Sequence, residues 1–250
     1  MKRLLVILGV MSLSTGSILV RWSTMPVSVL MSYRIGITII LLAPVVLLRN
    51  REELRRAERK TVLLSLAGGV FLGLQLITGY ESLRFLSVAT AVVLMDTEVL
   101  FVALATVLIF RKRLSAQAWF SIMLAFGGSV MVAAADMTAG ENVIQGNILA
   151  LSAALSLAIY TMIGSVCRRN LSNIAYSFFV CLSAGGTVLS FALFSGAPLK
   201  GYDTSNYLIA LAMAVLCTLL GMCVLSWGLK DLPPTFVSVA RLTEPLFAAV

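Results

Sequence analysis

The sequence predicts an all-α membrane protein that is an inverted repeat of two five-helix units. Three observations predict this fold class. The 250 residues are 60% hydrophobic and only 12% charged, whereas a soluble domain is about 45 to 50% apolar and about 25% charged. The second half of the chain repeats the first at an offset of 146 positions, and the basic residues collect in alternate loops between apolar segments.

Nine apolar segments each approach the roughly 20 residues that cross about 30 Å of hydrocarbon. The first unit, residues 1–135, contains five of them, at 4–20, 27–48, 61–80, 86–110 and 117–135. An outer linker follows at 136–145, and the second unit, 146–250, contains four, at 146–166, 172–194, 205–228 and 234–250. The offset predicts a tenth helix at roughly 263–281, so we expect an intact chain to need about 30 to 40 more residues.

The repeat also decides what the first segment is. Lys2 and Arg3 followed by an apolar run resemble the start of a signal peptide. The offset, however, lays this run on the clear segment that begins near Gly146. A cleaved peptide has no reason to belong to a repeat, so we predict a retained first helix.

The basic residues predict the orientation of the helices. With the N-terminus inside, fourteen Lys and Arg residues fall in inner loops and three in outer loops, which predicts a cytoplasmic N-terminus. Five helices per unit is an odd number, so the second unit enters the membrane from the opposite face. Many transporters use such an inverted repeat to expose one central site to each side in turn.

Several classes of protein are excluded by composition. The net charge is +8, but no aromatic residues are interleaved with the basic ones, so we expect no nucleic-acid partner. The chain has no histidine and its four cysteines lack CxxC spacing, so we expect neither a metal site nor another cofactor. It also lacks a GxxxxGK[ST] loop, which argues against ATP-driven pumping.

Ionisable side chains at membrane depth are the candidate site residues. One charge at the bilayer centre costs roughly 2.5 to 3.5 kcal/mol on insertion scales, so such groups face a bundle interior or a wet cavity and pair with each other. Arg241 and Glu244 are three residues apart and can pair locally. The candidate substrate- or proton-binding residues are Arg34, Asp96, Glu98, Arg241 and Glu244.

Asp96 and Glu98 are two residues apart, which separates them by about 200° around a regular helix. They cannot both point into one cavity unless the helix is locally distorted. We expect one of them to pair with Arg34 and the other to face the cavity, where burial favours a protonated carboxyl group. Such an acid binds a proton or a cationic substrate but not both, which is the physical basis of antiport. The alternative is that these pairs only fix helix packing.

Glycines and aromatic residues have two interpretations each. Gly69 and Gly73 form a GxxxG step that favours close helix packing, with hinging as the alternative. Gly127-Gly128 and Gly185-Gly186 lie in other predicted helices. Tyr80 and Trp227 occupy nearly equivalent positions in the two units. They are either interface-belt residues or aromatics that line the cavity.

The pattern resembles the drug/metabolite transporter superfamily, specifically its ten-helix EamA-type members. The resemblance rests on the two units, on Arg34, on Thr243-Glu244-Pro245-Leu246, and on Leu114 to Gln117 leading to Gly127-Gly128. Two features depart from the family pattern: Val99 stands where a proline is usual, and Arg111 to Arg113 replace a usual acidic residue. The resemblance implies a plasma-membrane carrier, usually an exporter of amino acids, other metabolites or drugs, often driven by protons.

We therefore predict a secondary active transporter of the cytoplasmic (inner) membrane, a proton-coupled exporter of small metabolites or drugs that works by alternating access. Its partners would be the lipid bilayer, a small-molecule substrate and protons, with homodimer formation left open. The alternatives are a passive facilitator with structural ion pairs and, less favoured for want of a nucleophile and base, a membrane sensor or enzyme.

Overall fold

The computed structural model describes residues 15–16, 19–108, 111, 115–116, 119–120, 122–124, 126–128, 131 and 142–222. Its named elements are helices, and the described residues include no strand. They are α2 (Val27–Arg49), α3 (Arg51–Arg56), α4 (Arg59–Ser82), α5 (Val88–Met95), α6 (Glu98–Leu108), α8 (Val143–Cys167), α9 (Asn173–Phe194), α10 (Thr204–Met213) and the π-helix η1 (Ala214–Met222).

Six stretches of the described chain are long and apolar enough to cross a membrane. They match six predicted segments and run over Val27–Leu48, Arg59–Ser82, Thr90–Leu108, Val143–Cys167, Asn173–Phe194 and Thr204–Gly221. The predicted segments at 4–20 and 117–135 lie partly outside the described residues, and the one at 234–250 lies wholly outside them.

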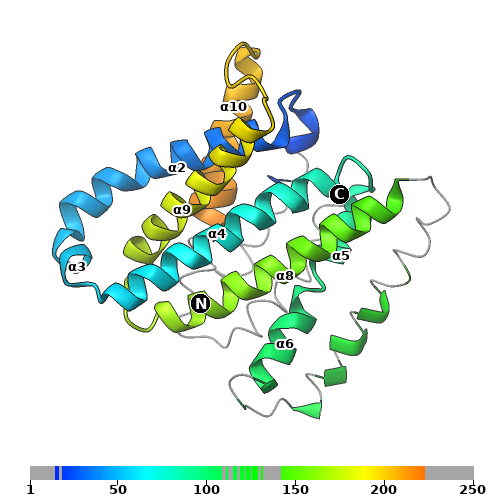
Figure 1. Ribbon diagram of the computed structural model, residues 1–250, viewed down its shortest axis with the longest axis horizontal. Helices are drawn as coiled ribbons and strands as arrows, with labels where there is room; N and C mark the ends of the chain where they lie inside the picture. The colour runs from blue at the N-terminus through cyan, green and yellow to red at the C-terminus, as the bar shows by residue number, and fades with distance from the viewer. Residues whose placement is uncertain are drawn as a thin grey trace.

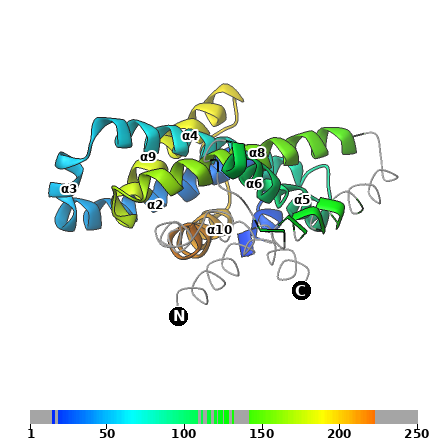
Figure 2. The same cartoon turned by 90° about the horizontal axis from the view of Figure 1, so that it is seen from below.

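Helices from the two units alternate in space. Helix α4 packs against both α8 and α9, α2 packs on α9, and α6 packs on α8. Figure 1 shows the resulting order α2, α9, α4, α8, α6 across one layer. Helix α10 contacts α2 and lies on one side of this layer (Figure 2). The main hydrophobic core of the described residues is therefore shared between the units.

The ends of α2 and α9 establish the inverted repeat. The offset of 146 makes these two helices equivalent. Asn50, directly after α2, donates a hydrogen bond of 3.2 Å to Ser172, directly before α9. Tyr33, near the start of α2, donates one of 2.9 Å to the carbonyl of Leu199, which follows α9. Equivalent helices thus run in opposite directions, which confirms the predicted inversion.

Close packing of α4 on α9 depends on glycine. A Cβ atom built at Gly69 would lie 2.3 Å from the carbonyl oxygen of Val180, and one at Gly73 would lie 2.9 Å from Cβ of Thr187. Only a residue without a side chain allows the backbones to approach this closely. The packing interpretation holds for these two residues, whereas a Cβ at Gly127 or Gly128 would meet no atom of the described residues within 4 Å.

The predicted single helix at 86–110 is divided into two. Ser87 caps α5 by accepting a 3.1 Å hydrogen bond from the backbone N–H of Thr90, and the helix ends at Met95. The N–H of Thr97 then donates to Leu94 and that of Val99 to Asp96, both at 3.2 Å. These i to i−3 bonds tighten the chain locally. The distortion therefore lies between Asp96 and Glu98, at the place where both acids could turn toward the protein interior.

Candidate functional site

Arg34 lies inside the bundle and is held by three elements. Arg34 lies in α2 and is only 1% exposed. Its Nε donates a 2.9 Å hydrogen bond to Oγ1 of Thr218 in η1. Its Nη1 donates to the Tyr80 hydroxyl of α4 at 3.1 Å and contacts Sδ of Met31 at 3.7 Å. Thr218 belongs to the second unit, so this contact joins the two units.

Tyr80 lines this site. The guanidinium carbon of Arg34 lies 5.8 Å from the centre of the Tyr80 ring, which adds a cation–π interaction to the hydrogen bond. Tyr80 thus contacts a buried charge inside the bundle, and its role as a cavity-lining aromatic stays a prediction. Trp227 lies outside the described residues.

Thr218 is a site residue that sequence reasoning missed. Helix α10 continues from Ala214 as a π-helix, a form found frequently at functional sites. The sequence signal was one hydroxyl in the apolar run AVLCTLLGM. Residues 15 and 16 pack against the neighbours of Arg34 and Thr218. A Cβ at Gly16 would lie 2.6 Å from the Tyr80 hydroxyl, and Oγ1 of Thr15 lies 3.7 Å from Sγ of Cys217, which directly precedes Thr218.

Glu98 also reaches a threonine of the second unit. It begins α6, is 1% exposed, and its Oε1 accepts a 2.7 Å hydrogen bond from Oγ1 of Thr161 in α8. Thr161 was missed as well. The available signal was the repeat, because the offset of 146 relates Thr161 to Thr15. Asp96 is 9% exposed and lies at the end of α5, next to the break.

The expected pairing of Arg34 with Asp96 or Glu98 is wrong for the described part of the chain. The acceptors of Arg34 there are two hydroxyl groups and a thioether. The physical reason is the helix order. Helices α2 and α6 lie at opposite sides of the layer, with α9, α4 and α8 between them (Figure 1).

Arg241 and Glu244 lie outside the described residues. Their pairing stays a prediction. The offset of 146 makes Glu244 equivalent to Glu98, so a role for Glu98 bears on Glu244 too.

Two polar clasps join the units at opposite ends of the bundle. In the first, which we call the Asn206 clasp, Oδ1 of Asn206 accepts hydrogen bonds from Oγ of Ser23 at 2.8 Å and from the backbone N–H of Thr24 at 2.9 Å. Asn206 is in α10 and the other two residues precede α2. This clasp therefore joins the loop before α2 to the third helix of the second unit.

The second clasp is centred on Glu53 in α3, and we call it the Glu53 clasp. The carboxylate accepts a 2.8 Å hydrogen bond from Nδ2 of Asn50 and another from the backbone N–H of Ser172, which precedes α9. The inverted repeat relates the two clasps, because each joins the loop between the first two helices of one unit to the region that begins the third helix of the other.

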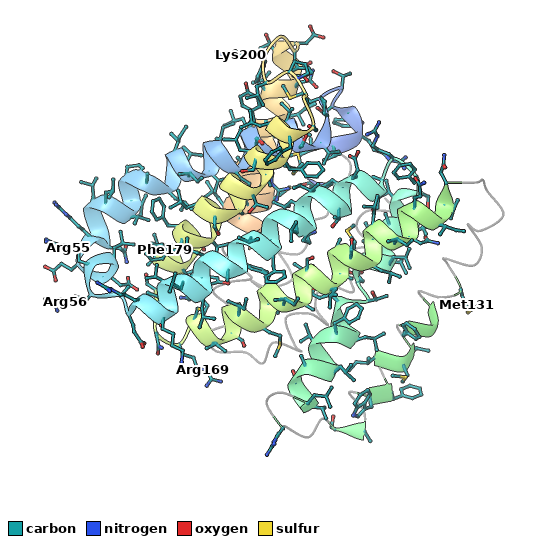
Figure 3. All side chains as sticks on the ribbon, in the orientation of Figure 1. Arg55, Arg56, Met131, Arg169, Phe179 and Lys200 are labelled. Atoms are coloured by element: carbon teal, nitrogen blue, oxygen red, sulfur yellow. The ribbon has the colours of Figure 1, made fainter. Side chains whose placement is uncertain are left out.

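Basic residues separate between the ends of the bundle. Figure 3 shows Arg55, Arg56 and Arg169 at the end that carries α3, whereas Lys200 lies far from them beside the start of α10. This separation agrees with the alternation predicted for the loops. No three His, Cys, Asp or Glu side chains of the described chain lie together as a metal site would need.

The fold and these contacts define a class: a multi-pass helical membrane protein of two interleaved, inverted units whose buried charges bond across the contact between the units. Within that class, the family model described as "EamA-like transporter family" matches residues 2–134 and again residues 144–250. The chain belongs to this family.

One solved structure, described only as "Crystal structure of protein", matches with a TM-score of 0.77 and 16% identity, over 99% of this chain and 86% of the other. At this identity the match shows the fold alone. No match was found among curated proteins.

Proposed function

We propose that this protein is a secondary active transporter of the cytoplasmic membrane, with its N-terminus inside, which exports small metabolites such as amino acids, or drugs, in exchange for protons. One observation carries the proposal. Arg34 and Glu98, both 1% exposed, are each hydrogen-bonded to a threonine of the other unit. Ionisable groups inside a membrane mark substrate or ion pathways.

The location of these contacts supports alternating access. If one unit rocks against the other around a fixed site, the contacts between the units rearrange. The surroundings of Glu98 would then differ between the two states, because its Thr161 partner lies on the other unit. A group that binds a proton with different affinity in two states biases the equilibrium between them, and this is how proton binding would drive transport.

The two clasps support the same mechanism. The Asn206 clasp and the Glu53 clasp lie at opposite ends of the bundle and both join the units. Opening one end requires one clasp to separate while the other holds. With both clasps formed, Arg34 is closed off from either side, which agrees with its 1% exposure.

Glu98→Gln tests the coupling. Purified protein in liposomes is given a pH gradient and a panel of amino acids and cationic dyes, and both substrate flux and proton flux are measured. We expect substrate-dependent proton flux for the unchanged protein and its loss for Glu98→Gln. The control is Glu52→Gln, because Glu52 lies in the short helix α3 outside the membrane-spanning stretches and its side chain is 88% exposed. Equal proton flux in both variants would contradict the role of Glu98.

A passive facilitator with structural charges is the second outcome of this experiment. Such a protein would carry substrate down its own gradient, and an uncoupler that collapses the pH gradient would not change the rate. Transport that stops with the uncoupler supports the proposed exchange for protons.

A further inference from the structure

We infer that Arg34 binds an anionic group of the transported molecule and that this group is a carboxylate. The inference rests on the proposed function, since it assigns a substrate class to the same transporter. It follows from the neighbours of the Arg34 guanidinium.

The first step is the charge of those neighbours. A guanidinium group stays protonated in proteins and has five N–H donors. Nε and Nη1 of Arg34 contact Thr218, Tyr80 and Met31, none of which carries negative charge. Within the described chain, Nη2 has no acceptor at all. Among the described residues, two N–H groups and a full positive charge therefore lack an anionic acceptor.

The second step is a comparison within the same protein. Arg168 is also 1% exposed, but it lies close enough to Glu53 for its charge to help lower the pKa of that carboxyl group. Arg168 also donates to the carbonyl of Leu171. The chain thus supplies a buried structural arginine with an acid, and Arg34 differs because no acid of the described residues contacts it.

The third step is the location of the site. Thr218 belongs to the second unit, whereas Arg34 and Tyr80 belong to the first. An anion that replaces the Thr218 contact, or adds to it, changes how the two units are joined. A transported substrate must change the contact between the units in this way, whereas a permanent counterion leaves that contact unchanged.

The fourth step selects a carboxylate. Apart from Arg59 and Lys60 at the start of α4, Arg34 is the single basic residue in the described membrane-spanning stretches. One positive charge balances one negative charge, and a planar carboxylate matches the guanidinium fork. A phosphate group with two negative charges would require a second cation, and the described membrane-spanning stretches supply none beside Arg34 except Arg59 and Lys60 at the start of α4. A cationic substrate would be repelled.

The rival explanation is a permanent counterion, and Glu244 is the acid that the sequence suggests for it. Glu244 lies outside the described residues, so the experiment must separate the two. The double variant Arg34→Gln with Glu244→Gln separates the two explanations because it removes both charges.

The experiment compares acids with matched neutral molecules. The probes are amino acids and short monocarboxylates, each paired with its primary amide, and cationic dyes complete the panel. Binding is measured as the rise in melting temperature of the purified protein in detergent, and transport as counterflow in liposomes. The variants are Arg34→Gln, Arg34→Lys, Thr218→Val and the double variant.

We expect the unchanged protein to prefer at least one acid over its amide by about 10- to 100-fold, the range of a charge-assisted hydrogen bond. Arg34→Gln should lose this preference. Arg34→Lys keeps the positive charge but lacks the planar guanidinium donors, so it should retain part of the preference for the acid. Thr218→Val keeps the guanidinium, so its preference should persist even if Arg34→Gln does not fold.

Three results would overturn the inference. If only neutral or cationic probes are transported, the inference about Arg34 is rejected but the proposed transport function is not. An acid preference that persists in Arg34→Gln or in the double variant would show that Arg34 is not the anion site. Failure of every member to be transported would instead reject the proposed function, and with it this inference.

Discussion

At the scale of single residues, hydroxyl groups stabilise the buried charges. Arg34 donates to Thr218 and Tyr80, and Glu98 accepts from Thr161. A hydroxyl group can both donate and accept, so the same type of residue can serve a cation and an anion. Because a threonine adds no charge, its hydrogen bond does not neutralise the guanidinium or the carboxylate.

Glu53 gives the first prediction at this scale. Burial by itself raises the pKa of the Glu53 carboxyl group, but hydrogen bonds from Ser172 and Asn50, together with the charge of Arg168, outweigh it and lower the pKa below its ordinary value. The unfolded chain titrates near the ordinary glutamate value of about 4.3. The stabilisation is therefore fully present above that value and is lost as the pH falls through the lower, folded-state pKa.

We expect Glu53→Gln to melt at a lower temperature than the unchanged protein at pH 7, and the difference to shrink as the pH falls below about 4. Melting curves in detergent from pH 7 down to pH 3 measure this. Glu58→Gln, at an exposed position close by, is the control. A difference that stays constant over the whole range would show that the Glu53 charge contributes nothing to the clasp.

At the scale of elements, the contact between α4 and α9 offers a packing prediction. Gly69→Ala would place Cβ 2.0 Å from Oγ of Ser183 and 2.3 Å from the carbonyl oxygen of Val180. The serine side chain can move, but the carbonyl belongs to the α9 backbone, so the helices must separate. We expect a loss of about 1 to 3 kcal/mol, as for overpacked cores.

Chemical or thermal unfolding in detergent measures this loss. Gly186→Ala in α9 is the matched control, because a Cβ there meets no atom of the described chain within 4 Å and alanine is the better helix former. Equal stability of the two variants would mean that α4 and α9 do not depend on close approach at Gly69.

The clasps give a second prediction at the scale of elements. Cysteines at Ser23 and Asn206, whose side chains now meet at 2.8 Å, allow the Asn206 clasp to be locked by a disulfide or a short bifunctional maleimide. We expect the locked protein to lose transport and a disulfide-locked protein to recover it with a reductant, because alternating access needs the clasp to separate.

Each single cysteine variant is the control and should remain active. Cysteines at Glu53 and Ser172 test the other clasp in the same way. Full transport with either clasp locked would argue against its separation during the cycle.

At the scale of the whole molecule, the inverted units predict which residues each side of the membrane can reach. Arg169 and Lys200 lie at different ends of the bundle (Figure 3). We expect an impermeant maleimide added outside intact cells to label Lys200→Cys and not Arg169→Cys, in a background without the four native cysteines. Disruption of the membrane should expose Arg169→Cys. Labelling of both positions in intact cells would contradict the predicted orientation.

Much of the fold was predictable because it depends on properties of local sequence. The length of each apolar segment, the offset of 146 and the bias of the basic loops are all visible in the chain. Six segments match the membrane-spanning stretches of the structure. The odd number of helices per unit then required the inversion, which the ends of α2 and α9 show.

The candidate site was predictable only in part. Sequence alone singled out Arg34 and Glu98 as candidates, because a charge in an apolar segment is conspicuous. It also indicated that Asp96 and Glu98 could face one side only if the helix is distorted between them. It assigned the wrong partner to Arg34 and overlooked Thr161 and Thr218. A single threonine among apolar residues is an ordinary feature of a membrane helix, so the sequence gives it no special weight.

The sequence by itself thus determined six membrane-spanning stretches of the described chain, the opposite directions of the equivalent helices α2 and α9, and the presence of Arg34, Asp96 and Glu98 within those stretches, since hydrophobicity and repeat register are set residue by residue along the chain. Tertiary structure alone decided what those charges touch. With α9 between α2 and α4, and α4 between α9 and α8, the threonine partners of Arg34 and Glu98 come from segments more than 60 positions away. A hydrogen bond at that separation depends on how two units pack, which no local property of either segment encodes.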